Sequence, residues 1–519
     1  MKYQVFSDNE WIYPDSEIST QNKAELHSAR GADVCFQILT DHVLKDGEKM
    51  TASFDLAGCT AMVYQLLPAH VGENSAADRL TTKNYDEVKH FVTRKAPFDV
   101  YELTVPIDSP ETEGGRAAFF VRINVEENAP VGVFEADLSI VMGPHALLVP
   151  VRIKIYNVQV PKLEEAEFHM VNWLPYDSTA RYYNEPKWSE KYLEYIAAYM
   201  DNQIDMRTDY LMIPSGEPVY DENGRVIDFD FSRAELMGNM ALEKGYNCVM
   251  GGFSVHWHRW DRATTYVLWD KEVDALSIEG YRQLKLYFTR AWECVQKNGW
   301  TGHYMQCIMD EPQFAGSTNY RAITSICRQC MPGIMINDPV ETPDLGGAID
   351  IWGVKQAIYE KYINEFKALQ EMGEQMWIYT CGFPAGYTMN RVIDIPLVAS
   401  RLVMWMCYKY GCTGFLHWGY GSHNPEGREE TVYRARDDRH FPPGNSFVVY
   451  NGKNGPFYAV RGHSQRTGAI DYELFNILGK RDKERALAII EKVCRTFDDY
   501  EWDAASLDNA RIELLEALG

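Results

Sequence analysis

The sequence predicts a multidomain α/β protein with an N-terminal β-sandwich, a (β/α)8 TIM-like barrel and C-terminal helices. Residues 1–160 contain short, partly alternating apolar segments separated by Gly, Pro, Asn and Asp, which is typical of a sandwich. After residue 166, short apolar runs alternate with amphipathic helical segments, which indicates βα units. At 519 residues the chain is too long for one ordinary domain. We expect a sandwich domain at 1–160, a catalytic barrel at 166–425 and a β-hairpin and helical extension, packed on the barrel, at 426–519.

The sandwich strands are expected at 33–39, 51–56, 61–66, 99–105, 117–125, 132–140 and 147–156. The barrel strands are expected at 167–173, 208–213, 247–251, 304–312, 334–337, 348–352, 374–380 and 413–418, with helices near 188–202, 232–244, 278–297, 318–329, 355–372 and 392–410. Eight strands close such a barrel, and its usual size is about 250 residues. A hairpin near 448–460 and two or three helices complete the chain.

Composition excludes several classes of partner. The net charge of −23 argues against nucleic acid and against anionic membranes, because both bind basic surfaces. No segment approaches the run of about 20 apolar residues that a membrane span requires. The N-terminal residues lack the apolar core of a secretory signal, and the 11 scattered cysteines fit reduced thiols better than disulfides. We therefore expect a cytoplasmic protein.

Two adjacent acids end the fourth barrel strand. Asp310 and Glu311 follow a buried apolar run and precede Pro312. Taken alone they fit a helix cap, with the proline at the first helical position. In a barrel, however, the carboxyl ends of the strands form the catalytic face. Neighbouring strand residues point in opposite directions, but a break enforced by Pro312 would bring both acids to the barrel mouth.

Polar and aromatic residues gather at the other strand ends, as a sugar-binding pocket requires. Each aromatic residue alone is more often part of the core, so the evidence is their coincidence at one face. The candidate substrate-binding residues are Asn172, Trp173, His256, His258, Asn337, Trp352, Trp377, Tyr379, His417 and Trp418.

The acids favour glycoside hydrolysis. That reaction needs an acid to protonate the departing oxygen and a second group to meet the developing cation. The seventh strand has no acid at its carboxyl end, and Glu374 lies at the opposite end. This absence favours attack by a substrate 2-acetamido oxygen. We expect Glu311 to be the acid/base, Asp310 to orient the amide and Tyr379 to bind the acetamido oxygen. Trp352, Trp377 or Trp418 would form the floor of the pocket.

An ordered set of motifs resembles glycoside hydrolase family 123 and its related uncharacterised barrel-domain family. These motifs are the Met309–Pro312 strand end and the segments 377–381, 393–396, 401–405, 408–411, 413–418 and 468–473. The resemblance implies an exo-acting β-N-acetylgalactosaminidase that works by substrate assistance on an oligosaccharide or glycoconjugate, with Asp310 and Glu311 as its catalytic pair and no cofactor. The segment 461–466 departs from the arginine-rich run usual in the family.

Three alternatives remain open at this point. Glu311 would pair with Asp338 or Glu341 in a barrel glycosidase of different sugar specificity. A carbohydrate-binding protein without catalytic activity would use the same fold. His256 and His258, with Asp261 nearby, would be ligands in a metal-dependent hydrolase, but no third histidine follows at the usual spacing. The lone CxxC at 327–330 lacks the second pair of a zinc site, so we expect no metal.

Overall fold

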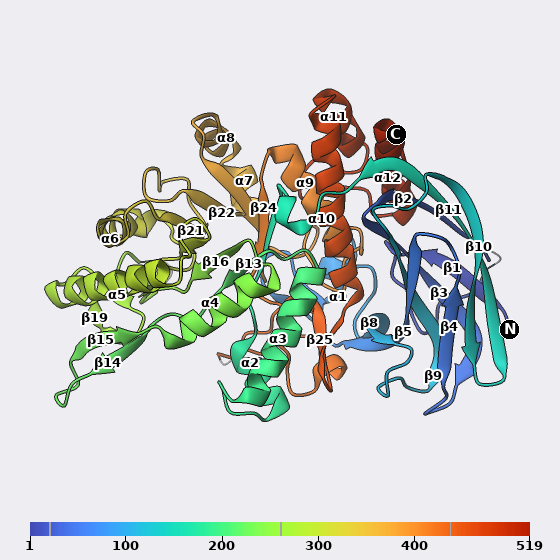
Figure 1. Ribbon diagram of the computed structural model, residues 1–519, viewed down its shortest axis with the longest axis horizontal. Helices are drawn as coiled ribbons and strands as arrows, with labels where there is room; N and C mark the ends of the chain where they lie inside the picture. The colour runs from blue at the N-terminus through green and yellow to red at the C-terminus, as the bar shows by residue number, and fades with distance from the viewer. Residues whose placement is uncertain (20–21, 260–261, 436) are drawn as a thin grey trace.

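The computed structural model describes residues 1–519 except 20–21, 260–261 and 436. The chain forms a sandwich lobe and a barrel lobe, with a long helix between them (Figure 1). No described helix is both long and apolar enough to cross a membrane.

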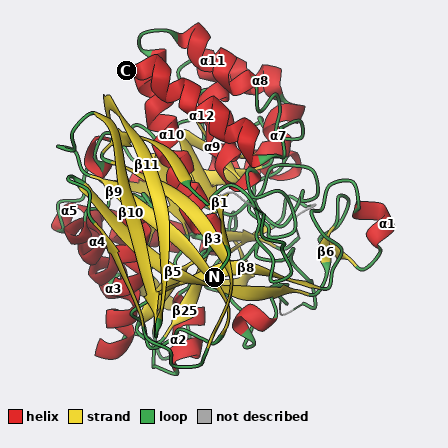
Figure 2. Cartoon of the chain, turned by 90° about the vertical axis from the view of Figure 1, so that its right-hand side faces the viewer, coloured by secondary structure: helices red, strands yellow, loops and turns green. Residues whose placement is uncertain are grey.

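The sandwich lobe consists of two sheets. The five-stranded sheet has the order β1 (Tyr3–Ser7), β3 (Ala32–Leu44), β9 (Gly115–Val125), β5 (Cys59–Val71) and β8 (Phe98–Pro106). The four-stranded sheet has the order β2 (Ala24–Arg30), β11 (His145–Gln159), β10 (Gly132–Met142) and β4 (Met50–Phe54). Figure 2 shows the long strands of both sheets, among them β3, β9, β10 and β11. Every sandwich strand that the sequence predicted is present.

The five-stranded sheet is buried on both faces. Phe119 and Val121 pack between the two sheets, whereas Phe120 packs toward Leu397 and Val460 of the barrel lobe. Strand β9 therefore contains a continuous buried run from 117 to 123, as expected for a strand covered on both sides. This second apolar face joins the two lobes through burial of apolar side chains.

The barrel is closed and follows the predicted strand order. Its parallel strands are β12 (His169–Asn172), β13 (Tyr210–Met212), β16 (Cys248–Gly251), β20 (Tyr304–Gln306), β21 (Met335–Val340), β22 (Ile351–Lys355), β23 (Gln375–Tyr379) and β24 (Gly414–His417). Strand β20 is shorter than predicted. The backbone N–H of Ile308 donates to the side chain of Asp338 at 2.9 Å, so this side chain takes the place of a strand carbonyl and the fourth strand ends early.

The predicted barrel helices are present, with changes in two places, and α2 (Tyr176–Tyr183) is an additional helix that was not predicted. The predicted helices are α3 (Glu190–Asp205), α4 (Ser232–Lys244), α5 (Ile278–Lys297), α6 (Ser317–Cys330), α7 (Gln356–Lys361), α8 (Ile363–Glu371) and α9 (Ala399–Tyr410). The helix predicted at 355–372 is broken at Tyr362, where φ is −119°. The helix predicted from residue 392 begins only at Ala399, because Pro396 precedes it and Asp394 bonds to Ser75 of the sandwich lobe instead.

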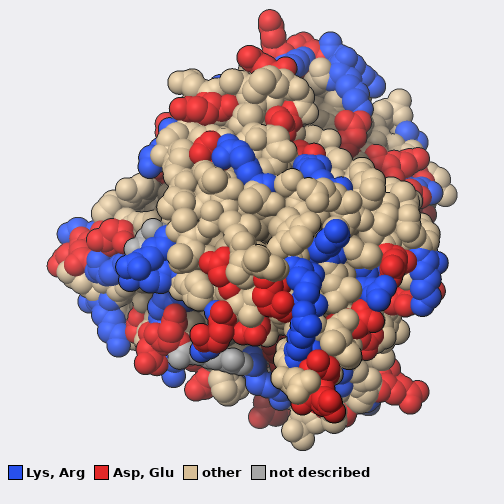
Figure 3. Space-filling model, turned by 90° about the vertical axis from the view of Figure 1, so that its left-hand side faces the viewer, with Lys and Arg blue, Asp and Glu red and all other residues tan. Residues whose placement is uncertain are grey.

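The C-terminal segment forms the hairpin β25 (Val449–Gly452) and β26 (Gly455–Tyr458), followed by α10 (Val460–Gly479), α11 (Lys483–Glu491) and α12 (Ala504–Leu518). Helix α10 is buried on nearly every face and lies between the lobes in Figure 1. At its start, Arg461 Nε donates to Glu102 Oε1 of β8 at 2.8 Å, and both side chains are fully buried. Figure 3 shows the face that lies on the left in Figure 1, and acidic and basic side chains are interspersed over it.

Candidate active site

A cavity of about 430 Å³ opens at the carboxyl ends of the barrel strands. Its polar wall contains Asp310, Glu311 and Lys355. Its aromatic wall contains Trp173, Tyr379, Phe383, Trp418, Tyr433 and Phe441. The volume lies in the usual range for small-molecule sites, and the mixture of a few charged groups with aromatic faces suits a sugar.

An unusual backbone conformation directs both adjacent acids into this cavity. Glu311 has a φ of +48°, in the left-handed region that side-chain-bearing residues seldom occupy. The turn is held on both sides, because Glu311 N donates to Pro339 O at 3.0 Å and Glu341 N donates to Pro312 O at 3.1 Å. Trp257 Nε1 also donates to the backbone oxygen of Asp310 at 3.0 Å. In a regular strand, the two carboxyls would point to opposite faces.

Glu311 is fixed by two donors on one oxygen. The Tyr379 hydroxyl donates to Glu311 Oε1 at 2.6 Å, and Lys355 Nζ lies 3.1 Å from the same oxygen. Lys355 also pairs with Glu341 Oε1, whose second oxygen accepts from Gln313 Nε2 at 2.8 Å. One ammonium group therefore bridges two carboxylates.

Asp310 has a different environment. Burial, followed by the neighbouring charge of Glu311, raises the pKa of Asp310 to about 8, and Lys355 only partly opposes this rise. No hydrogen bond reaches its side chain from the part of the chain that the structure describes. Burial by itself lowers the pKa of Lys355, but Cys381, Glu311 and Glu341 outweigh it, so this pKa lies above its usual value. Near neutral pH, Asp310 thus keeps a proton, and the ammonium group of Lys355 lies at ion-pair distance from Glu311.

Three predicted substrate-binding residues line the cavity together with the acids: Trp173, Tyr379 and Trp418. The Trp173 ring packs edge-on against Phe253, with centroids 5.6 Å apart. The Trp418 ring packs against Phe441 at 5.4 Å. These contacts hold both indole rings in the cavity wall.

Asn172 and His417 lie beneath the cavity wall and bind a buried arginine. Arg391 Nη1 donates to Asn172 Oδ1 at 2.7 Å, and Arg391 Nη2 lies 2.7 Å from His417 Nδ1. Burial and then Arg391 hold the pKa of His417 well below its usual value, so the imidazole is neutral. Both residues fix the segment after β23 and do not line the cavity, contrary to expectation.

Trp352, Trp377 and Asn337 also lie outside the cavity. Trp352 points outward, where its Nε1 donates to Glu374 Oε2 at 3.0 Å. Trp377 fills the barrel interior and packs against Tyr210 at 5.2 Å. Asn337 is fully buried in the barrel and donates to a backbone oxygen of β22. Strand alternation turns Trp352 to the outer face of the barrel. Trp377 and Tyr379 share the inner face, but Trp377 lies deeper, so only Tyr379 reaches the mouth.

The two predicted histidines lie on a small sheet beside the barrel, formed by β17 (Val255–Trp257), β18 (Thr265–Val267) and β19 (Asp270–Asp274). His256 stacks on Tyr266 with ring centroids 5.6 Å apart, and His258 packs against the same ring at 4.7 Å. Neither histidine lines the cavity. Asp261 lies outside the described residues. Within the described ranges, no three acidic, histidine or cysteine side chains form a group able to hold a metal ion.

The alternative second acids are placed unfavourably for catalysis. Asp338 points into the helical layer, where it accepts from the Tyr320 hydroxyl at 2.7 Å and from the N–H of Ile308. Burial raises its pKa well above the usual range. Glu341 forms an ion pair with Lys355 and is not among the residues that line the cavity. Asp338 therefore stabilises the end of the fourth strand.

Sequence reasoning missed Lys355 because it placed the sixth strand at 348–352. The strand is Ile351–Lys355, so the lysine ends an apolar strand as Asp310 does. That pattern was a usable signal. Leu80, Tyr433 and Phe441 come from loops distant in sequence, and no local pattern marks them as cavity residues.

Comparisons with known proteins agree with this architecture. The model of the glycoside hydrolase 123 catalytic domain matches residues 173–478, from the end of β12 through nearly all of α10. A structure of a family 123 glycoside hydrolase from Clostridium perfringens, described for glycolipid glycan hydrolysis, is similar with a TM-score of 0.73 and 12% identity, over 99% of this chain and 96% of that chain.

Two further solved structures are less similar. A family 10 xylanase with a bacterial Ig-like domain, from termite gut, has a TM-score of 0.36 and 12% identity over 86% of this chain and 99% of that chain. An endo-β-1,4-mannanase from Thermotoga petrophila has a TM-score of 0.37 and 13% identity over 60% of this chain and 78% of that chain. No curated protein matches the sequence. The family model spans more than half of the 519 residues, and the chain therefore belongs to glycoside hydrolase family 123.

Proposed function

We propose that the protein is an exo-acting β-N-acetylgalactosaminidase that works by substrate-assisted, retaining catalysis. One observation carries the proposal: among the described residues that line the cavity, the acids are Asp310 and Glu311, and both come from one strand end. The ordinary two-carboxylate mechanism places its acids on opposite sides of the scissile bond. With both acids on one side, the nucleophile is best supplied by the 2-acetamido oxygen of the substrate.

In this mechanism, the acid pair contributes one proton and one negative charge. The acetamido N–H donates to Asp310 and so favours its ionised form. The proton of the pair then belongs to Glu311, which delivers it to the glycosidic oxygen as the C1–O bond breaks. The acetamido oxygen bonds to C1 and forms an oxazolinium ion, whose positive charge Asp310 stabilises.

The second half of the reaction reverses these proton movements. Glu311, now a carboxylate, takes a proton from the water that attacks C1. The bond from C1 to the acetamido oxygen breaks, and the released sugar has the configuration of the substrate. Tyr379 donates to Glu311. Once Glu311 is protonated, this hydroxyl can turn to the acetamido oxygen.

The cavity walls support recognition of a single terminal sugar. Trp173, Trp418 and Phe441 offer aromatic faces to the apolar side of the ring and to the acetamido methyl group. The family 123 enzyme from C. perfringens acts on glycolipid glycans. We infer that the leaving group of this enzyme is likewise the remainder of an oligosaccharide or glycoconjugate.

A panel of p-nitrophenyl β-glycosides tests the proposed specificity. The expected order of kcat/KM is GalNAc above GlcNAc, with galactoside and glucoside turned over at least a hundredfold less, because they lack the acetamido nucleophile. A thiazoline that mimics the oxazolinium ion should inhibit competitively. Comparable turnover of the plain galactoside, or no effect of the thiazoline, would overturn the proposal.

A further inference from the structure

Lys355 occupies a position that the proposed chemistry does not require. It ends strand β22, its side chain is 9% exposed, and it lies in the cavity wall beside the acid pair. Its ammonium group is 3.1 Å from Glu311 Oε1 and also pairs with Glu341 Oε1. A lysine beside a proton donor opposes protonation of that donor, so its presence needs an explanation.

The balance of charge around Lys355 explains why a lysine is present at this position. Glu311 and Glu341 are 21% and 18% exposed and share this one ammonium group. If Asp310 were also ionised, three carboxylates would surround a single cation in a poorly solvated site. Retention of one proton by Asp310 avoids this excess of negative charge.

The other groups that face the pair leave this balance unchanged. From the end of β23, the Tyr379 hydroxyl donates to Glu311, while burial raises the pKa of the Cys381 thiol to about 11, so both remain neutral near pH 7. From the loop after β24, Arg439 Nε donates to Asp437 at 2.7 Å. Behind the pair, Asp338 is held by Tyr320 and by the backbone of Ile308.

We propose that Lys355, anchored by Glu341, is a positioning residue that keeps Glu311 ionised in the empty site and thereby assigns the single proton of the acid pair to Asp310. The proton reaches Glu311 only when a ligand stabilises the Asp310 carboxylate. In that step the O–H bond of Asp310 breaks and an O–H bond forms on Glu311, while Lys355 remains paired with Glu341. This last part rests on the proposed function, since the stabilising ligand is the substrate acetamido N–H.

The distribution of the proton can be measured in the empty enzyme. A water-soluble carbodiimide activates protonated carboxyls, and an added amine then labels each carboxyl in proportion to its protonated fraction. Peptide mass spectrometry of the segment around Asp310 and Glu311, over pH 5 to 8, gives the labelling of each acid. In the wild type we expect labelling at Asp310 to persist to higher pH than labelling at Glu311.

Substitutions at Lys355 and Glu341 should move this pattern in opposite directions. Lys355→Met removes the cation, so labelling of Glu311 should extend upward by about one pH unit or more. Glu341→Gln removes a competing anion, so labelling of both acids should end at lower pH than in the wild type. Lys355→Arg keeps the charge and should resemble the wild type, as should Lys367→Met on the exposed face of α8.

An unchanged labelling pattern in folded Lys355→Met, or shifts of the same sign in Lys355→Met and Glu341→Gln, would overturn the proposal. Glu341→Gln is nearly isosteric and preserves the test if Lys355→Met fails to fold. Because the labelling needs no substrate, its outcome does not depend on the proposed function.

Activity gives a second, separate readout. On the best aryl glycoside, both limbs of the pH profile of kcat/KM should move to higher pH in Lys355→Met and to lower pH in Glu341→Gln. A purely structural role would lower kcat without moving the profile, and that result would contradict the proposal. If the wild type cleaves no 2-acetamido glycoside, the proposed function fails, while the labelling still decides the role of Lys355.

Discussion

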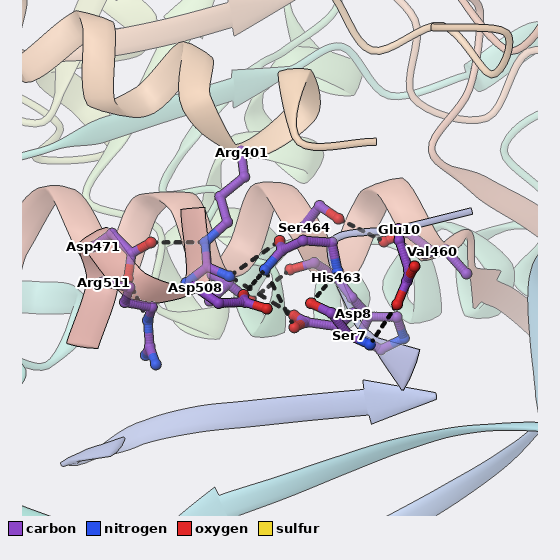
Figure 4. Close-up of polar contacts among 12 residues, drawn as sticks. Ser7, Asp8, Glu10, Arg401, Val460, His463, Ser464, Asp471, Asp508 and Arg511 are labelled. Carbon is purple, nitrogen blue, oxygen red and sulfur yellow. Dashed lines mark hydrogen bonds and ion pairs between the residues drawn. The ribbon is translucent and has the colours of Figure 1, made fainter. Parts of the chain in front are cut away.

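Two of the buried clusters of acids and cations differ in how well their charges are matched. At the junction between the sandwich and the C-terminal helices, Asp8, Asp471 and Asp508 surround Arg401 and Arg511 (Figure 4). At the cavity wall, Lys355 pairs with both Glu311 and Glu341, and Asp310 lies beside Glu311. The junction thus has two cations for three acids, and the cluster around Lys355 has one cation for three acids.

The geometry of the donors differs as well. Asp471 accepts from Arg401 Nε at 2.7 Å, from Arg511 Nε at 2.9 Å and from Trp405 Nε1 at 3.0 Å. Although burial raises the pKa of Asp471, these partners outweigh burial and lower it below its usual value. Among the described residues Asp310 has no such donors, and its pKa is raised. A buried acid with matched donors stabilises the fold, whereas an acid left protonated in a cavity is available for proton transfer.

The largest losses of kcat/KM are expected for substitutions of the two cavity acids, and the two losses should depend differently on the leaving group. Glu311→Gln should lower kcat/KM by roughly 10²–10⁴-fold for poor leaving groups, the usual contribution of a general acid. The loss should be much smaller for a 2,4-dinitrophenyl leaving group, which needs no protonation. Asp310→Asn should lower both rates, because the oxazolinium charge loses its counterion.

A leaving-group series with both variants measures these effects. Glu374→Gln, at the opposite end of the barrel, is the matched control and should keep near-normal turnover. The proposed roles would be wrong if Asp310→Asn, rather than Glu311→Gln, showed the strong dependence on the leaving group.

At the junction, Asp471→Asn should affect stability and leave the chemistry intact. It leaves Arg401 and Arg511 without their shared anion, and breaking a buried ion pair typically costs about 3–5 kcal/mol. Denaturant unfolding should show this loss, while kcat of the folded fraction at low temperature should stay near the wild-type value. A selective loss of kcat without a loss of stability would contradict the contrast between the clusters.

A smaller effect is expected at Asp8, the less well matched acid of the junction. Burial raises its pKa from 3.8 to about 6, and Arg401 only partly opposes this. A raised pKa means that the folded state binds the proton more tightly than the unfolded state. The stabilisation is therefore complete below about pH 4 and is lost as pH rises through 6, amounting to about 2–3 kcal/mol.

Asp8→Asn should remove this pH dependence. Free energies of unfolding measured from pH 4 to pH 7 should fall less steeply in the variant than in the wild type. Parallel curves would show that Asp8 does not titrate with folding as described.

The sequence predicted the fold more completely than the site. The barrel strands were readable because each is a short apolar run between polar loops. The start of α9 was not, because Asp394 bonds to Ser75, more than 300 residues away in the chain. Such a tertiary contact decides where the helix begins, even where the local sequence pattern favours an earlier start.

The sequence placed residues correctly at the cavity where their position at a strand end alone decided it. Asp310 and Glu311 reach the cavity because the extended backbone breaks at this point, and Pro312 indicated that break in the sequence. The prediction for Trp352 and Trp377 was wrong about their position. Whether a side chain lines the cavity depends on the face of the strand that carries it and on its distance from the barrel mouth, and an apolar run reveals neither. Lys355 was hidden by an error of three residues in the strand boundary.

The central claim, that the substrate's own amide is the nucleophile, is tested most directly by weakening that nucleophile. p-Nitrophenyl 2-acetamido-β-galactosides with zero, one, two and three fluorine atoms on the acetyl group differ little in size but steadily in the basicity of the amide oxygen. The proposed mechanism predicts that kcat/KM falls steeply with each fluorine, by orders of magnitude across the series. A flat series would contradict it and would require an enzymatic nucleophile.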